Sequence, residues 1–161
     1  MTIAEYNKSV DDFSDGLYRF ILKNIKDEEK AKDIIQDTYE KLWIRISNVS
    51  YEKVKSYLFT AAYHTMIDMI RKEKRQDNME KINADMYSHT KQYTGISEIL
   101  EEAVNKLPDD QRSVILLRDY EGYSYDEIAD ITGLNESQVK VYIYRGRMFL
   151  KKYLGSIETV I

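Results

Sequence analysis

Apolar residues recur every three or four positions over most of the chain, which is the spacing of one face of an α-helix. In the first half, three segments follow this pattern, at about residues 10–25, 27–46 and 54–75. A short polar loop over residues 47–53 separates the second segment from the third. With one proline and six glycines, the chain has too few turn formers for a loop-rich β protein, so the pattern predicts helices.

The periodicity disappears over residues 76–97, where polar residues predominate. Four further helical segments follow, and Pro108 ends the first of them. We therefore predict an all-α fold of two small helical domains, residues 1–75 and 98–161, with residues 76–97 as a flexible linker between them. This linker is expected to be the most mobile and protease-sensitive segment.

The C-terminal domain has the layout of a helix-turn-helix over residues 124–147. Ser124 and Glu127 form a capping pair for one helix, and Asn135 and Gln138 form a second pair that opens the next helix. Polar side chains at the start of such a helix read base edges in the major groove, while Lys and Arg further along bind phosphates. The candidates on this helix are Ser137, Gln138, Lys140, Tyr144, Arg145 and Arg147. Ordinary packed helices with a solvated basic face remain the alternative.

The net charge of −4 conceals a strong segregation along the chain. Residues 55–75 carry five basic and two acidic side chains, a net +3, and residues 136–152 carry five basic and one acidic, a net +4. Residues 98–135 carry ten acidic and three basic side chains, a net −7. Two short basic helices in an acidic protein indicate local contact with phosphate.

Composition argues against several other kinds of site. There are no cysteines, and His64 and His89 cannot form a His-rich metal site alone, so we expect neither a metal nor a cofactor. Asp68 and Glu73 lie beside no nucleophile or metal partner, so no enzyme is expected. No apolar run approaches the roughly 20 residues of a membrane span. The N-terminus lacks the basic start and apolar stretch of a signal peptide, which indicates a cytoplasmic protein.

Three longer motifs stand in order along the chain. They are AKDIIQDTYEKLW at residues 31–43, YLFTAAYHTMIDMIRKEKR at residues 57–75, and a pattern of Leu-Pro, Arg, Val, Leu-Arg, Gly, Ser and Glu-Ile-Ala from Leu107 to Ala129. In these motifs the sequence resembles the extracytoplasmic-function (ECF) sigma factors of bacterial RNA polymerase. The first corresponds to the family pattern A-x-D-x-x-Q-[DE]-x-[FY]-x-x-x-W. The resemblance covers nearly the whole chain, and three motifs at family distances make it specific.

The resemblance implies an adaptor, not an enzyme, that brings core RNA polymerase to promoter DNA. The N-terminal domain would bind polymerase and capture the melted −10 strand, and the helix-turn-helix would enter the major groove at the −35 element. Anti-sigma factors are common in the family, and the sequence leaves open whether this chain has such a partner. The rivals are a dimeric helix-turn-helix repressor or activator, and a sigma-like protein that docks without opening a promoter.

The resemblance also assigns residues to each surface. The polymerase-docking residues are Asp33, Gln36, Asp37 and Glu40. The residues assigned to contact with the −10 element are Tyr51, Tyr57, Tyr63, His64, Arg71, Lys72, Lys74 and Arg75. The residues assigned to the −35 element are the six helix-turn-helix candidates above. Without the resemblance, the acidic set would be interpreted as a solvated face. Several of the aromatic residues must belong to the core, and Trp43 is interpreted as core with a role at the interface rim.

Three positions depart from the family pattern. His64 stands where the family usually has Asn, and Val141 and Tyr142 stand where Ser and Arg are common. We expect these changes to affect promoter preference and to leave the fold intact.

Overall fold

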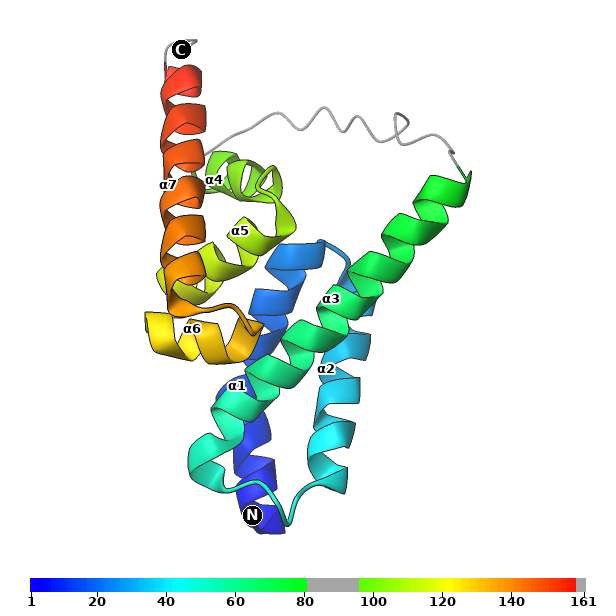
Figure 1. Cartoon of the computed structure of the whole chain (residues 1–161). Helices are drawn as coiled ribbons and strands as arrows, with labels where there is room; N and C mark the ends of the chain where they lie inside the picture. The colour runs from blue at the N-terminus through cyan, green and yellow to red at the C-terminus, as the bar shows by residue number, and fades with distance from the viewer. Residues whose placement is uncertain (81–95, 159–161) are drawn as a thin grey trace.

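The structure, a computed structural model, describes residues 1–80 and 96–158, and every regular element in these two ranges is helical. The N-terminal half consists of α1 (Ile3–Ile25), α2 (Glu28–Ile44), the 3-10 turn η1 (Tyr51–Lys53) and α3 (Val54–Glu80). The C-terminal half consists of α4 (Ile96–Asn105), α5 (Asp109–Ile115), the π-helical turn η3 (Leu116–Tyr120), α6 (Tyr125–Thr132) and α7 (Glu136–Glu158), as Figure 1 shows. The predicted all-α class is confirmed. Residues 81–95, most of the predicted linker, lie outside the described residues, and so does the expectation about their mobility.

The N-terminal half is a three-helix unit in which α3 crosses α1 and α2 (Figure 1). Thr2 and Glu5 form a capping box that starts α1, and the Asp27 carboxylate accepts a hydrogen bond from the backbone N–H of Lys30 to start α2. The helices bury one apolar face each. The fully buried side chains of this core include Leu17, Phe20, Ile21, Ala31, Leu42, Leu58, Ala62 and Met66.

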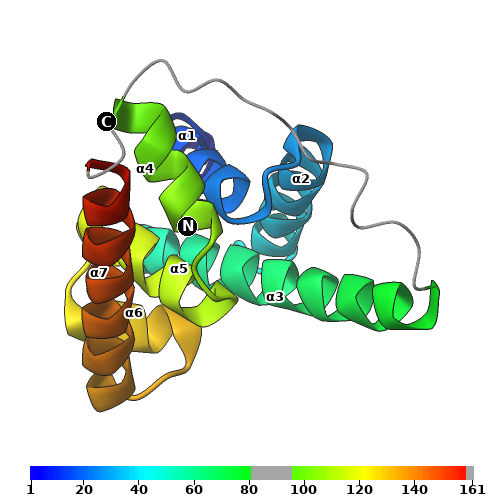
Figure 2. The same cartoon turned by 90° about the horizontal axis from the view of Figure 1, so that it is seen from above.

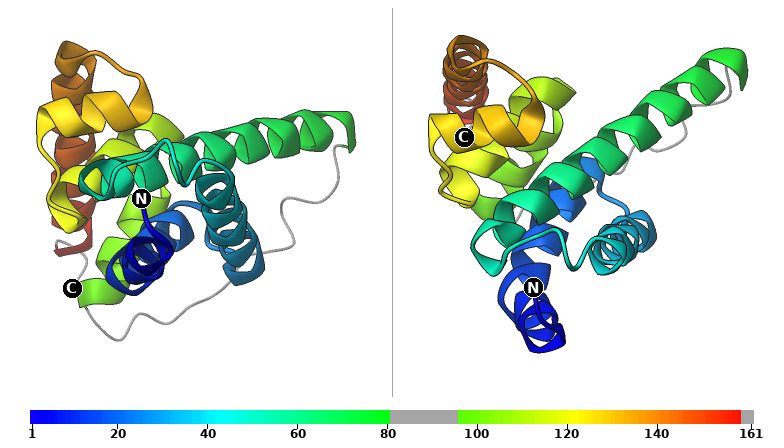
Figure 3. Two further views of the ribbon diagram at one scale, coloured as in Figure 1. Left: turned by 90° about the horizontal axis from the view of Figure 1, so that it is seen from below. Right: turned by 60° about the horizontal axis from the view of Figure 1, so that its bottom comes forward.

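Two helices of the N-terminal half are longer than the periodicity indicates. α1 begins at Ile3 instead of near residue 10, because its capping box lies upstream of the apolar stripe. α3 continues to Glu80, so the first five residues assigned to the linker are helical. Its last turns are rich in Lys, Arg, Glu and Gln, which favour helix without forming an apolar face. In Figures 2 and 3 this end of α3 projects away from the other helices.

The C-terminal half contains the expected helix-turn-helix, formed by α6 and α7, and α7 packs on α5. Both capping pairs are present: Ser124 and Glu127 exchange side chain–backbone hydrogen bonds, and so do Asn135 and Gln138. Gly133 ends α6 at φ 78°, a left-handed conformation that glycine adopts without strain. The turn between the two helices is therefore fixed by residues that the sequence already identified.

The two halves pack against each other and share one continuous core. α6 contacts α3, and α4, α5 and η3 contact α1 (Figures 1 and 3). The rings of Phe59 on α3 and Tyr123 before α6 meet edge to face, with their centroids 5.2 Å apart. The Ser113 hydroxyl donates to the side-chain oxygen of Asn24 at 3.1 Å, and both residues are buried. The two predicted domains thus pack against each other across an extended interface.

Candidate polymerase and nucleic-acid interfaces

The polymerase-docking candidates lie on the outer face of α2. Asp33, Gln36 and Glu40 are exposed and Asp37 is half-buried, while Ala31, Ile34, Thr38, Tyr39 and Leu42 face the core. Lys41 pairs with Asp37 at 3.0 Å, so one of the four carboxylate or amide groups already has a cationic partner. Asp33 and Asp37 also line a shallow groove between α2 and α3. The four side chains form one acidic stripe, as their spacing predicts.

Apolar side chains extend this acidic stripe at the end of α2. Trp43, interpreted from sequence as core, is 50% exposed, and Ile44 is 79% exposed. The Trp43 ring lies edge to face against Tyr6, with 5.2 Å between centroids. The assignment of Trp43 to the core was wrong, because α2 ends here and the ring rests on α1 with one side open. No pattern in the sequence marks Ile44 as exposed.

The aromatic candidates for the −10 element differ in accessibility. His64 is exposed and Tyr57 is half-buried. The hydroxyl of Tyr51 donates to Asp12 at 2.8 Å, so this ring is tied to α1. Tyr63 is buried, and burial raises its pKa. In this arrangement His64 is therefore the most accessible of the four.

The basic candidates of α3, Arg71, Lys72, Lys74 and Arg75, are all exposed. Lys74 nevertheless forms an ion pair of 2.7 Å with Asp109 at the start of α5. Burial alone would raise the pKa of Asp109, but the hydrogen bond from Lys74 and the charges of Arg112 and Lys74 lower it below its ordinary value. One of the four predicted DNA contacts is thus neutralised by the C-terminal half.

A cleft of about 620 Å³ separates this part of α3 from the C-terminal half. Four of the −10 candidates, Tyr63, His64, Arg71 and Lys74, line its α3 side. The opposite side is lined by Pro108, Asp109, Asp110, Thr132 and Leu134. The structure therefore brings half of the −10 set to a surface that faces acidic groups of the same chain.

The −35 candidates are placed on the outer side of α7, and all six are exposed. The side-chain oxygen of Gln138 accepts a hydrogen bond from the backbone N–H of Asn135, so part of this side chain serves as a helix cap. Lys140 lies 3.5 Å from Glu136 in an intrahelical ion pair. Arg147 donates two hydrogen bonds to Asp119 of η3, at 3.2 and 2.6 Å, which raises its pKa. Arg147, one of the predicted phosphate contacts, thus already has an anionic partner within the chain.

A polar network that the sequence did not reveal joins the two halves. Arg112, with only 11% of its side chain exposed, donates to the backbone oxygens of Asn24, Val104, Asn105 and Leu107 and to Asp109. It thereby satisfies carbonyls at the ends of both α1 and α4. Arg19 of α1 forms a two-bond pair with Glu121, at 3.0 and 3.1 Å. Partners about 90 to 100 residues apart leave no local pattern in a sequence.

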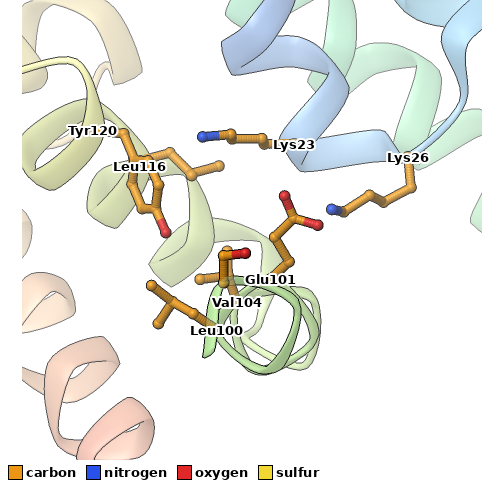
Figure 4. A pocket seen from close by; sticks show the side chains of 8 residues that line it. Lys23, Lys26, Leu100, Glu101, Val104, Leu116 and Tyr120 are labelled. Atoms are coloured by element: carbon orange, nitrogen blue, oxygen red, sulfur yellow. The ribbon is translucent and has the colours of Figure 1, made fainter. Parts of the chain in front are cut away.

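Figure 4 shows a smaller cavity, of about 210 Å³, where the end of α1 meets α4 and η3. Lys23 lies over the ring of Tyr120, with its ammonium 4.0 Å from the centroid. Glu101 points toward the space between Lys23 and Lys26 (Figure 4). Ser97, Leu100, Val104 and Leu116 complete the lining. Because its lining comes from the end of α1 and from α4 and η3, this cavity belongs to the interface between the halves.

No set of three His, Asp or Glu side chains within residues 1–80 and 96–158 is arranged to hold a metal ion. In the same part of the chain, no helix is both long and apolar enough to cross a membrane.

Comparison with known proteins agrees with this arrangement. The family model for sigma-70 region 2 matches residues 10–76, and the model for sigma-70 region 4 matches residues 97–150. The chain is 30% identical over 156 residues to the ECF RNA polymerase sigma factor SigM of Bacillus subtilis, with 94% of each chain covered. It is also 30% identical over 161 residues to the sigma factor YlaC of the same organism, covering 92% of this chain and 93% of YlaC.

Solved structures show the same fold. The sigma factor RpoE of Bartonella quintana, crystallised with the anti-sigma factor NepR, superposes with a TM-score of 0.79 at 25% identity, over 95% of this chain and 98% of RpoE. CnrH, solved with the cytosolic domain of CnrY, gives a TM-score of 0.67 at 20% identity, over 94% and 88% of the two chains.

An all-helical chain with region 2 in its first half and a region 4 helix-turn-helix in its second is a sigma factor of the sigma-70 class. The chain belongs to the ECF sigma factors, the non-enzymatic factors that recognise promoters and start transcription with RNA polymerase. The resemblance seen in the three sequence motifs is confirmed. A conventional dimeric helix-turn-helix regulator does not account for the match to region 2.

Proposed function

We propose that the N-terminal half docks on core RNA polymerase and captures the melted −10 strand, and that α7 enters the major groove of the −35 element. The observation that carries this proposal is the outward face of α7, on which all six −35 candidates are exposed. A helix of this kind fits the major groove, and its cations lie where phosphates would flank it. We place the protein in the cytoplasm, with the polymerase.

Promoter binding in this form requires the two halves to separate. By their names, the −10 and −35 elements lie about 25 base pairs apart, or roughly 85 Å of duplex at about 3.4 Å per base pair. In the structure, α6 of the helix-turn-helix packs directly on α3, the −10 helix. Packed helices have axes only about 8–10 Å apart. The closed arrangement therefore suits the free factor, and we infer that an extended one forms on the promoter.

The direct test is run-off transcription with purified core polymerase and a promoter library randomised at both elements. We expect transcripts only when the chain is added, with defined sequences enriched at each element. Binding to polymerase without any transcript would favour a sigma-like interaction protein. Specific binding to duplex DNA as a dimer, without polymerase, would favour a conventional regulator.

The docking surface on α2 is tested separately by Asp37→Arg. Reversing this charge should weaken binding to core polymerase roughly tenfold, because the partner surface is proposed to be basic. Glu28→Arg is the matched control, since it makes the same charge change on an exposed residue of the first turn of α2, outside the four candidates. Titration of labelled factor with core polymerase measures the affinity, and circular dichroism checks the fold. Equal affinity of Asp37→Arg and the control would refute the assignment.

An anti-sigma factor is a further proposed partner. The support is that RpoE, which shares this fold and 25% of its sequence with the chain, was crystallised with one. Co-purification of the tagged chain with such an inhibitor, followed by loss of run-off transcription when the inhibitor is added, tests this proposal.

A further inference from the structure

The outward face of α7 carries an apolar stripe for which packing within the chain gives no reason. Val141, Tyr144 and Met148 are 43%, 65% and 48% exposed. They are three and four residues apart, so a helix with 3.6 residues per turn aligns them along one line. The buried Val139 and Ile143 face the opposite way, into the C-terminal half. The stripe therefore points directly outward.

Basic residues border this stripe on both sides. At 3.6 residues per turn, Lys140, Arg147 and Lys151 lie along one edge, and Arg145 and Lys152 lie along the other. A ligand that matches this pattern has two anionic rims and a floor with apolar groups between them. The major groove of duplex DNA has this form, since two phosphate backbones flank a floor about 12 Å wide. The apolar group on that floor is the C5-methyl of thymine.

The same charge pattern disfavours other occupants of the stripe. A second copy of the chain would bring a second row of Lys and Arg against the first, and like charges facing each other weaken association. An uncharged apolar helix would cover the stripe but would offer no anionic groups to the cations on its edges. Duplex DNA is the occupant that satisfies the stripe and its edges together.

We propose that Val141, with Tyr144 beside it, contacts thymine methyl groups in the −35 element. The proposal rests on the function proposed above and adds which chemical group of the −35 element α7 recognises. Both residues lie in the first three turns of α7, the part of a recognition helix that reaches base edges. Valine has no side-chain hydrogen-bonding group, so any contact it makes with a base edge is apolar. Met148 lies further along, where the helix leaves the groove.

The test removes only the methyl group. A −35 element selected from a randomised library is synthesised with each thymine replaced in turn by deoxyuridine, and binding by the holoenzyme is measured. We expect at least one replacement to weaken binding about three- to fivefold, the effect of exposing one methyl group. In Val141→Ser, the same replacement should have no further effect, because the two changes remove one shared contact. Tyr144→Ser is tested in the same way at the neighbouring thymine.

Ile3→Ser is the matched protein control, because Ile3 is 63% exposed but lies on α1. It should keep the full sensitivity to deoxyuridine, and deoxyuridine in the spacer should have no effect. The proposal is overturned if no −35 replacement weakens binding, or if the sensitivity persists in both serine variants of α7. Scrambling the −35 element separates the two levels of inference. If scrambling has no effect, the proposed function fails as well, whereas if scrambling abolishes binding and the methyl groups do not matter, only this inference fails.

Discussion

The two basic helices of the chain, α3 and α7, differ in how far their proposed DNA-binding surfaces are exposed. On α7, all six candidate residues and the apolar stripe face outward. On α3, Tyr63 is buried, Lys74 is paired with Asp109, and four candidates line a cleft that faces the C-terminal half. The closed chain therefore exposes the proposed −35 surface and partly covers the proposed −10 surface. On the proposed assignments, opening the chain matters more for capture of the melted strand than for binding of the duplex element.

The largest expected effect comes from Tyr123, whose ring joins the C-terminal half to Phe59 of α3. Tyr123→Ala should destabilise the chain by about 3–5 kcal/mol, because it removes a buried ring from the shared core. It should also open the halves and expose the α3 candidates. Urea unfolding measures the first effect. Because the chain has no cysteine, energy transfer between dyes on Ser47→Cys and Asp126→Cys measures the second.

Tyr123→Phe is the control for this variant. The Tyr123 hydroxyl is buried and has no hydrogen-bond partner within the described part of the chain, and burial raises its pKa. Removing it should leave stability equal or slightly higher, by up to about 1 kcal/mol, since a buried group without a partner is costly. Closed halves in Tyr123→Ala, or a large loss in Tyr123→Phe, would contradict this account of the interface.

A second prediction concerns base reading by α7. Gln138→Ala and Lys140→Ala should change which −35 sequences are selected, at a cost of about 1–3 kcal/mol at the preferred site. Because Gln138 also caps α7, its variant needs a parallel measurement of unfolding. Selection over randomised −35 elements gives the preference. Preferences identical to wild type in both variants would show that the start of α7 does not read bases.

A third, smaller effect distinguishes two arginines of α7. Arg145→Ala should lower the salt dependence of DNA binding by about 0.9 in the slope of log K against log salt, the value for one lost phosphate contact. Arg147→Ala should change the slope less, because Arg147 is already paired with Asp119. Salt titrations of both variants on one −35 duplex provide the measurement. A larger change for Arg147 would mean that its pair with Asp119 breaks on DNA.

The smallest effect is a pH dependence of the interface at Asp109. Its pKa in the folded chain lies below the ordinary value of 3.8, so its contribution is present above that pH and is lost as the pH falls through the folded value. Since Lys74 is largely exposed, we expect less than about 1 kcal/mol. Asp109→Asn should therefore lose less stability than wild type between pH 7 and pH 3. Asp110→Asn, which removes an exposed neighbouring carboxylate outside this ion pair, is the matched control.

What the sequence could predict was local. The capping pairs at Ser124 and Asn135 and the turn before α7 depend on residues within a few positions, and the structure confirms them. The face of α2 follows from helical spacing in the same way. The contact between Asn24 and Ser113 spans 89 residues, and no periodicity encodes it. Burial of Tyr63 likewise depends on how the halves pack, which is why an aromatic residue assigned to DNA is covered in the closed chain.

The shared core between the halves also sets a thermodynamic threshold for any partner. Because one polypeptide carries both halves, reclosure is intramolecular, and short tethers give effective concentrations on the order of millimolar. A protein that docks on the covered side of α3 must displace the C-terminal half, which competes with it for this surface. Its apparent dissociation constant equals the intrinsic value divided by the fraction of molecules that are open. Variants that loosen the interface should therefore bind such a partner more tightly without any new contact.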